Sequence, residues 1–417
     1  MKKKNIFSII CVLGSCLILL PAVSFSQFTE YSNEFLNIGA GARGMAMGNA
    51  QVASVDDATA GYWNPAGLTN VKDHAQVSLM HSEYFAGIGK YDFGAVAVPI
   101  ANNTRTLGFT ILRFAVDDIP NTLFLVAPDG SINYNNVQSF SSADYAFLFS
   151  FAQKVKTKPT KEVSFGFNAK VIRRVVGTFA NAWGFGIDAA FQYRGNHLRI
   201  GVVAKDLTST FNAWAFTFTD AEKQQLILAD NDVPVKSTEL TAPSTIVGIG
   251  YRFFNNKSTL NLMAEIGANV TYDGKRNTAY STNQVSVDPH LGMELSLKNS
   301  FFVRGGITNI QQVLDDADTL NQKKTWIYQP SIGAGFRIGQ VTIDYAYTNL
   351  ANQSNPLYTN VLSLKLNIVK GGKASQFHYV PNVITTPPPV NPTPPPPANN
   401  NTDPSQPPPI HNNPFAQ

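Results

Sequence analysis

Several stretches of the chain alternate between apolar and polar side chains with a period of two. In residues 182–194, aromatic and aliphatic side chains interleave with Gly, Asp, Ala and Gln, and residues 162–174, 258–270 and 284–297 follow the same pattern. This period indicates β-strands, because successive side chains of a strand point to opposite faces. In a soluble sandwich the apolar faces would turn inward, whereas in a membrane barrel they face lipid and the polar faces line the lumen.

The lengths of the connections distinguish these two architectures. The pattern predicts fourteen strands, at residues 74–82, 89–100, 105–114, 142–153, 162–174, 182–194, 197–206, 242–254, 258–270, 284–297, 300–307, 326–338, 340–348 and 358–369. The connections at 115–141 and 207–241 are long, whereas those at Gly195-Asn196 and Gly339 are very short. Long loops on one side and short turns on the other are typical of an outer-membrane barrel, whose short turns lie in the periplasm.

We therefore predict an all-β fold, an antiparallel transmembrane β-barrel of about 14 strands over residues 73–370, multi-pass in the cell outer membrane. An even number of strands would place both termini on the periplasmic side. A barrel of this size lies between the eight-stranded barrels that side chains fill and the sixteen-stranded barrels that leave an open channel. An internal plug is therefore expected.

The composition agrees with a barrel and excludes other classes. Charged residues make up 14% of the 417 residues, below the ~25% of ordinary soluble proteins, and the mean hydropathy of −0.08 is too low for a bundle of membrane helices. The formal charge of +4 lacks the clustered basic excess that nucleic-acid binding requires. Nucleic acid is therefore not an expected partner.

Residues 1–26 have the features of a secretory signal peptide. Lysines at positions 2–4 precede an apolar stretch over residues 6–20, and cleavage is expected between Ser26 and Gln27. The alternatives are a retained membrane anchor and lipidation at Cys16. The stretch is short for a membrane anchor, and the apolar run continues past Cys16, which argues against lipidation. Because the only cysteines lie inside this segment, the mature chain would have no disulfide and no thiolate metal site.

Residues 371–417 are expected to form a disordered periplasmic tail. Prolines recur there in runs such as 387–389 and 394–397, and proline lacks the backbone donor that helices and sheets need. The segment would be an extended polyproline II tether. It would act as a spacer or, alternatively, as a docking ligand.

Residues 27–72 precede the first strand and are rich in Gly and Ala between Gly39 and Gly67. Small side chains let backbones approach closely, so this segment would fit inside the lumen as a hatch. Its candidate functional residues are Gly39, Gly41, Arg43, Gly44, Gly48, Asp56, Asp57, Asn64, Pro65, Ala66 and Gly67.

The string from Gly39 to Leu68 resembles the N-terminal signature of the PorV/PorQ family of Bacteroidota, itself similar to FadL-type fatty-acid transporters. The Asn-Pro-Ala element at residues 64–66 is the part shared with the FadL type, and residues 117–122 resemble a further segment of the family. The resemblance is strongest over residues 35–70, is diffuse over the barrel and does not extend to the proline-rich tail.

This resemblance implies a fourteen-stranded FadL-like barrel with an N-terminal hatch, associated with type IX protein secretion. The implied partners are outer-membrane lipid, the secretion translocon and the C-terminal signals of secreted cargo. PorV itself departs from the Asn-Pro-Ala-Gly-Leu form found at residues 64–68. The chain is therefore a candidate paralogue of PorV. This departure weakens the expectation of a cargo role more than that of the fold.

The hatch also matches a dinucleotide-binding fingerprint, Gly39-x-Gly41-x-x-Gly44. That fingerprint requires a preceding buried strand and a βαβ unit, and residues 30–38 do not form such a strand pattern. Asp56 and Asp57 are expected to cap a helix or to pair with Arg43, rather than to act as a catalytic pair.

No catalytic residue, cofactor or metal is predicted. The six histidines lack metal-ligand spacing. Asp315, Asp316 and Asp318 would form a solvated acidic loop or, alternatively, supply hard oxygen ligands for Ca²⁺. Ionisable residues at lumen-facing positions are expected to hold barrel and hatch together: Lys170, Arg194, Glu265, Glu294 and Arg337.

An aromatic segment falls in the longest predicted external connection. Exposed apolar patches mark interaction surfaces, so Phe211, Trp214, Phe216 and Phe218 are candidate partner-binding residues. They would form a lid, a lipid contact or a protein-docking surface.

Two functions remain open. The first is an accessory or adaptor of type IX secretion that binds cargo or other components through extracellular loops. The alternative is a FadL-like transporter of hydrophobic small molecules such as fatty acids. A transporter requires a continuous apolar pocket of a few hundred Å³ beside the hatch, whereas an adaptor requires a filled lumen and an apolar loop rim. Nothing in the sequence indicates an enzyme.

Overall fold

Strands make up most of the chain. The computed structural model describes residues 32–369 except 86, 128, 159–160, 255–258, 315–323 and 350–357. The strands are β1 (His74–Tyr84), β2 (Gly89–Ile100), β3 (Arg105–Asn121), β4 (Gln138–Lys158), β5 (Lys161–Val176), β6 (Ala180–Arg194), β7 (Leu198–Lys205), β8 (Thr210–Phe216), β9 (Ser237–Thr241), β10 (Ser244–Arg252), β11 (Leu260–Thr271), β12 (Tyr280–Ser281), β13 (Ser286–Leu297), β14 (Phe301–Leu314), β15 (Lys324–Ile338), β16 (Val341–Asn349) and β17 (Tyr358–Val369).

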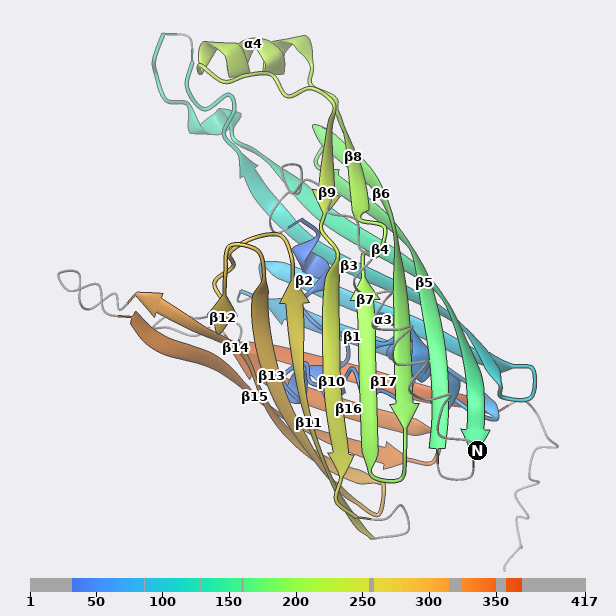
Figure 1. Ribbon diagram of the computed structural model, residues 1–417. Coiled ribbons are helices and arrows are strands. Elements are labelled where there is room, and N and C mark those ends of the chain that lie inside the picture. The colour runs from blue at the N-terminus through green and yellow to red at the C-terminus, as the bar shows by residue number, and fades with distance from the viewer. Residues whose placement is uncertain are drawn as a thin grey trace, which may run out of the picture. The chain divides into compact units, whose positions relative to one another are not determined.

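All strands belong to one antiparallel sheet that closes on itself. β1 pairs with β2 on one side and with β17 on the other. The 17 strands occupy fourteen positions around the wall, because β7 and β8, β9 and β10, and β11 and β12 each follow one another at a single position. The predicted fourteen-stranded antiparallel barrel is therefore confirmed (Figure 1).

Large apolar side chains cover the outer face of the wall. On β5 and β6, Phe167, Phe185 and Ile187 are 50%, 47% and 44% exposed, whereas Asn168 and Asp188 are buried on the inner face. The apolar side chains thus point outward, as the alternation predicts, instead of meeting at a common core. An exterior of this kind is what a transmembrane barrel presents to lipid.

The connections of the two ends differ in length. At one end, hairpins such as β2–β3 and β13–β14 turn within a few residues, and we call this the short-turn end. At the opposite, long-loop end, β3–β4 and β8–β9 extend beyond the rest of the wall (Figure 1).

Two segments predicted as uninterrupted loops contain further strands. β3 continues to Asn121 and β4 begins at Gln138, while β8, β9 and a helix lie within residues 207–241. The alternation is weak there because, beyond the lipid, neither face of a strand has to be apolar. Pro120 is tolerated because this part of β3 is paired only with β4, which leaves it as an edge.

The wall is broken where β7 gives way to β8. β6 pairs with β7 along its C-terminal part and with β8 along its N-terminal part. Between β7 and β8, Asp206 and Ser209 adopt φ values of 53° and 58°, which interrupt the strand. Beside this break, the buried Lys170 amine pairs with the carboxylates of Asp188 and Asp206.

The described part of the predicted hatch, residues 32–72, lies inside the lumen and contains four short helices. These are η2 (Glu34–Leu36), α2 (Ala42–Ala46), α3 (Ala60–Trp63) and η3 (Pro65–Asn70), and two further helices, η4 (Tyr134–Asn136) and α4 (Asp220–Leu228), lie in the long loops. Across the described ranges, no helix has both the length and the apolar character needed to cross a membrane.

The first described residues of the hatch lie in the long-loop half of the lumen. Asn33 Nδ2 donates to Thr241 Oγ1 (2.8 Å), and Asn212 Nδ2 donates to Asn33 Oδ1 (3.1 Å). From there the hatch runs to the short-turn end, where β1 begins at His74. The predicted signal peptide (1–26), the tail (371–417) and both chain ends lie outside the described residues.

Candidate functional site

Glycines of the predicted motif allow the hatch to fold tightly. Gly41 and Gly48 flank α2 with φ values of 79° and 60°, a backbone conformation that favours glycine. A Cβ at Gly44 would lie 2.8 Å from Trp63 Cζ2, and a Cβ at Gly67 would collide with atoms of the hatch itself. These positions therefore exclude larger residues for steric reasons.

The barrel wall carries further glycines where the hatch backbone touches it. A Cβ at Gly166 would collide with the backbone of Pro65 and Ala66, and a Cβ at Gly306 with the backbone of Met47. Gly201 and Gly292 meet hatch backbone in the same way, and a Cβ at three further glycines would collide with hatch side chains: Gly108, Gly248 and Gly333. The hatch therefore contacts the wall around much of its circumference.

The Asn-Pro-Ala element forms the corner between α3 and η3. Asn64 Oδ1 accepts a hydrogen bond from Ala66 N–H (3.1 Å), and Asn64 Nδ2 donates to the carbonyl oxygens of Val52 (2.8 Å) and Phe191 (3.1 Å). Pro65 occupies the first helical position, where its missing N–H is not needed. The element thus ties two parts of the hatch to β6.

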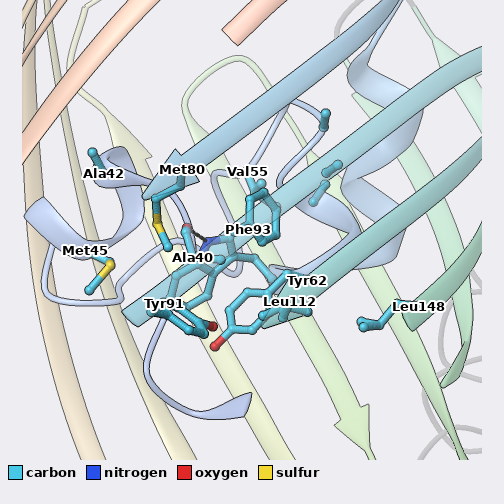
Figure 2. Packing of buried hydrophobic residues seen from close by; sticks show 14 of the residues in the cluster. Ala40, Ala42, Met45, Val55, Tyr62, Met80, Tyr91, Phe93, Leu112 and Leu148 are labelled. Atoms are coloured by element: carbon cyan, nitrogen blue, oxygen red, sulfur yellow. Dashed lines mark hydrogen bonds between the residues drawn. The ribbon is translucent and has the colours of Figure 1, made fainter. Parts of the chain in front are cut away.

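One side of the hatch is apolar. Tyr62 and Trp63 are each 5% exposed, and their rings meet edge to face with centroids 4.9 Å apart. Tyr62 also packs edge to face against Phe93 of β2. Figure 2 shows Tyr62 beside Tyr91, Phe93 and Leu112 of the wall. This side of the lumen is filled by side chains.

The same two aromatic residues fix the start of the hatch. The Tyr62 hydroxyl accepts a hydrogen bond from Gly39 N–H (3.0 Å) and donates to the Leu36 carbonyl (2.8 Å). Trp63 Nε1 donates to the Ala40 carbonyl (2.8 Å). Residues 36–40 are therefore held against α3.

The other side of the hatch is held by charges. Arg43 lies 2.9 Å from Glu294 of β13 and 3.6 Å from Asp56 of the hatch. Arg304 of β14 shares Glu294 (2.7 Å) and also pairs with Asp344 of β16 (2.7 Å). The predicted pairing of Arg43 with Asp56 is therefore present, and it belongs to a longer network.

The paired hatch carboxylates extend this network to other strands. Asp56 lies 3.1 Å from Arg194 and 3.8 Å from Arg199, and Asp57 lies 2.7 Å from Lys365 of β17. Burial acts to raise the pKa of both carboxyls, but the neighbouring cations outweigh it and hold each pKa below its usual range. Both groups are therefore charged at neutral pH and act as anchors.

A chamber of about 380 Å³ lies above the hatch at the long-loop end. Ile38 and Asn49 of the hatch line it, together with Tyr84, Phe85 and Phe114 of the wall and its turns. The remaining lining side chains are polar or charged. The chamber thus has an aromatic wall and a mostly polar remainder.

A second chamber, of about 640 Å³, lies below the hatch at the short-turn end. Its lining includes Arg43, Asp56 and Asp57 of the hatch and the start of β1 at His74. It shares no lining residue with the 380 Å³ chamber. The hatch therefore separates two chambers of different character.

The candidate partner-binding residues do not lie in a loop, apart from Phe218. Phe211 is on the outer face of β8 with its ring 5.7 Å from that of Phe185, and Trp214 and Phe216 are half-buried on the same strand. Phe216 stacks on Phe218 with centroids 6.4 Å apart. The loop assignment was wrong because β8 pairs with β6 above the break, and a role in partner binding stays a prediction.

The lumen-facing charges meet the expectation only in part. Arg194, Glu265 and Glu294 contact hatch atoms, whereas Lys170 pairs with wall carboxylates and Arg337 donates to a wall hydroxyl. Further charged residues at the site were not singled out from the sequence: Arg199, Arg252, Arg304 and Lys365. Each of them falls on the alternate positions of its strand that were predicted to face the lumen. This pattern is the signal that could have revealed them.

Within the part of the chain that the structure describes, no group of three or more His, Cys, Asp or Glu side chains is placed to hold a metal ion. The acidic loop of Asp315, Asp316 and Asp318 lies outside the described residues.

No family model and no curated protein matches the chain. Among solved structures it is similar to the CymD monoaromatic hydrocarbon channel (13% identity, TM-score 0.49, 80% of this chain and 98% of that chain). It is also similar to the Pseudomonas putida toluene transporter TodX (11%, 0.48, 80% and 98%) and to a Pseudomonas aeruginosa FadL homologue (12%, 0.44, 79% and 98%).

Proposed function

We propose that the chain is an outer-membrane uptake channel for small molecules that combine an apolar body with polar groups. The 380 Å³ chamber carries this proposal, because its volume falls within the roughly 300–1,000 Å³ of ligand pockets. Its apolar part is formed by Ile38, Tyr84, Phe85 and Phe114, and polar side chains supply the rest. The lining suits an amphipathic molecule better than a pure hydrocarbon.

The hatch is the barrier that such a molecule has to pass. Ile38 and Asn49 line the upper chamber, whereas Arg43, between them in sequence, lines the lower one. The stretch around α2 therefore lies between the chambers. Uptake requires this stretch to move locally and to give up its contacts with wall glycines such as Gly306, while the Asn64 corner and the contact of Gly166 with Pro65 and Ala66 keep the later part of the hatch in place.

Filling the upper chamber tests the proposal. Thr308→Trp places a large side chain in the chamber, whereas Ile307→Trp places the same side chain at the neighbouring position of β14, outside the chamber lining. Accumulation of radiolabelled 1-naphthol is measured in cells whose outer membrane carries the full chain. We expect T308W to abolish the barrel-dependent uptake and I307W to retain it. Equal uptake by both variants would refute the channel function.

A second function, an adaptor of type IX secretion, has separate support at the long-loop end. Gln225 Nε2 of α4 donates to the Val126 carbonyl (3.3 Å), which places α4 beside the β3–β4 loop. Large apolar side chains are exposed on these two segments: Val126, Ile132, Tyr134, Ile227 and Leu228. Exposed apolar side chains that gather in one region mark interaction surfaces.

The adaptor function is tested by recovery of partners on the tagged full chain. Leu228→Glu removes an apolar side chain that is 74% exposed, and Lys223→Glu changes charge on the same helix without touching the apolar set. Loss of secretion components or cargo with L228E but not with K223E would support the adaptor. Recovery of lipid alone by the unaltered chain would refute it.

A further inference from the structure

The chamber at the short-turn end has a large excess of positive charge. Eight of its lining residues are Arg or Lys, and three are Asp or Glu. The three carboxylates already have partners, because Glu294 is shared by two arginines, Asp56 by three, and Asp57 pairs with a lysine. The remaining cations face the cavity without compensation from its lining.

Two arginines of the lining have no carboxylate partner among the described residues. Arg337 donates from Nε to Thr342 Oγ1 (3.2 Å), and its guanidinium lies 5.3 Å from the centre of the Phe302 ring. These contacts orient the Arg337 guanidinium while leaving its terminal nitrogens available. Arg252 forms no ion pair within the described part of the chain. Both side chains are partly buried at the cavity wall.

A guanidinium in a partly enclosed cavity is stabilised by an anion. Its planar fork of donors matches a carboxylate or a phosphate, with which it forms two parallel charge-assisted hydrogen bonds. Clefts lined by one sign of charge also concentrate ligands of the opposite sign. A further observation agrees with this, since the buried Arg43 Nη1 lies 3.6 Å from Asp56 Oδ1 and makes no hydrogen bond among the described residues.

We propose that the 640 Å³ chamber is a binding site for small molecules that carry a carboxylate or a phosphate group, with Arg252 and Arg337 as the residues that contact the anion. The volume lies in the range of small-molecule sites. Because the chamber lies below the hatch, anion binding in it does not depend on whether the barrel performs uptake.

Direct binding to the purified full-length barrel in a non-ionic detergent tests this site. Calorimetric titrations use succinate, inorganic phosphate and the uncharged succinamide, none of which enters micelles. Succinate or phosphate is expected to bind, and the tighter of the two identifies the preferred anion. Succinamide is expected not to bind, and added NaCl should weaken anion binding through screening.

Charge-neutralising variants locate the site. Arg252→Gln and Arg337→Gln should each weaken anion binding about tenfold, the loss expected for one charge-assisted contact. Neither change leaves a carboxylate without a partner, so the barrel should fold. Arg105→Gln is the matched control, because Arg105 is exposed at the same end of the barrel and does not line the chamber.

Three results would overturn the proposal. The first is that neither anion binds the unaltered barrel, and the second is that succinamide binds as tightly as succinate. The third is that R105Q weakens anion binding as much as R252Q and R337Q do. The last result would show attraction to the general surface charge instead of a site. None of these results depends on 1-naphthol uptake, so failure here is distinct from failure of the channel function.

Discussion

The two sides of the hatch meet the barrel wall in different ways. On the side of β1–β4, Tyr62 and Trp63 join an apolar cluster of wall side chains that fills the lumen (Figure 2). On the side of β13–β17, Arg43 and Asp57 reach wall residues through ion pairs, and a chamber of about 640 Å³ remains beside them. The same segment thus forms a solid contact on one side and an open, charged one on the other.

This difference shows which chemistry can leave space inside a barrel. Apolar side chains are stabilised by contact in any direction, so they fill the available volume. Buried charges need partners in specific directions, and leaving them unpaired is costly. An interior built on charges therefore keeps room for solvent or for a ligand.

The largest effect is expected where hatch and wall backbones touch. Gly306→Val would drive a side chain into the backbone of Met47 and Gly48, whereas Gly305→Val adds one on the opposite face of β14, where the nearest atom is 3.8 Å away. G306V should lose about 3 kcal/mol or more of folding stability, at or above the usual range for overpacking. Thermal unfolding in detergent, followed by heat-dependent gel mobility, measures the loss.

G305V is the control for that substitution and should change stability by less than about 0.5 kcal/mol. Equal losses in G305V and G306V would show that β14 requires glycine for its own pairing, and the hatch contact would then have no measurable part in stability.

A smaller loss is expected on the charged side. Glu294→Gln removes the carboxylate shared by Arg43 and Arg304, each of which keeps a second carboxylate. The expected loss is about 2 kcal/mol, the value of a hydrogen bond to a charged group. Glu83→Gln is the control, because the Glu83 side chain is 61% exposed. Similar unfolding temperatures for E294Q and E83Q would contradict a stabilising role of the network.

On the apolar side, Trp63→Phe removes the indole N–H that donates to the Ala40 carbonyl. The carbonyl stays buried without this donor, so we expect a loss of about 1 kcal/mol, a typical value for one neutral hydrogen bond. Trp183→Phe, at a residue 49% exposed on the outer face, should be nearly neutral. If W183F lost as much folding stability as W63F, the effect would come from the loss of any tryptophan and not from the hydrogen bond within the hatch.

The smallest effect concerns pH. Burial raises the pKa of Asp57, but Lys365 and Arg43 together hold it below its unfolded value, so the stabilisation is complete above about pH 4 and is lost as pH falls through the folded pKa. Asp57→Asn should therefore be less stable than the parent at pH 7, and this difference in the free energy of unfolding should become smaller as the pH falls. Asp220→Asn, at a side chain 96% exposed, should show no such change. A gap for D57N that is constant from pH 7 to pH 3 would contradict the assignment.

The barrel could be predicted from the sequence because lipid and lumen impose opposite requirements on alternate residues. On β5 and β6 this alternation identified Phe167 and Phe185 as outward-facing, and the structure places them there. Where strands extend past the lipid, as in β8 and β9, the requirement ends and the alternation weakens. The sequence therefore predicted loops at positions that form strands.

The alternation predicted that wall residues such as Glu294 contact the hatch, but which two residues pair was predictable only over short sequence separations. Arg43 and Asp56 are both within the hatch, and their pairing followed from proximity and charge. The contact of Arg43 with Glu294 spans 251 residues and depends on barrel closure and on the register of β13. The positions of Arg252 and Arg337 in one chamber likewise follow from closure, which periodicity alone does not specify.

The break after β7 has a consequence for how the molecule tolerates change. The ring closes through β6–β7, β7–β10 and β10–β11, so the hairpin of β8, α4 and β9 is attached above a circle that is already complete. A short turn joining Lys205 to Ser244 would preserve every pairing of that circle. The part of this hairpin that can diversify most freely is therefore the connection with α4, because β8 also pairs with β6 and both strands hold Asn33 of the hatch.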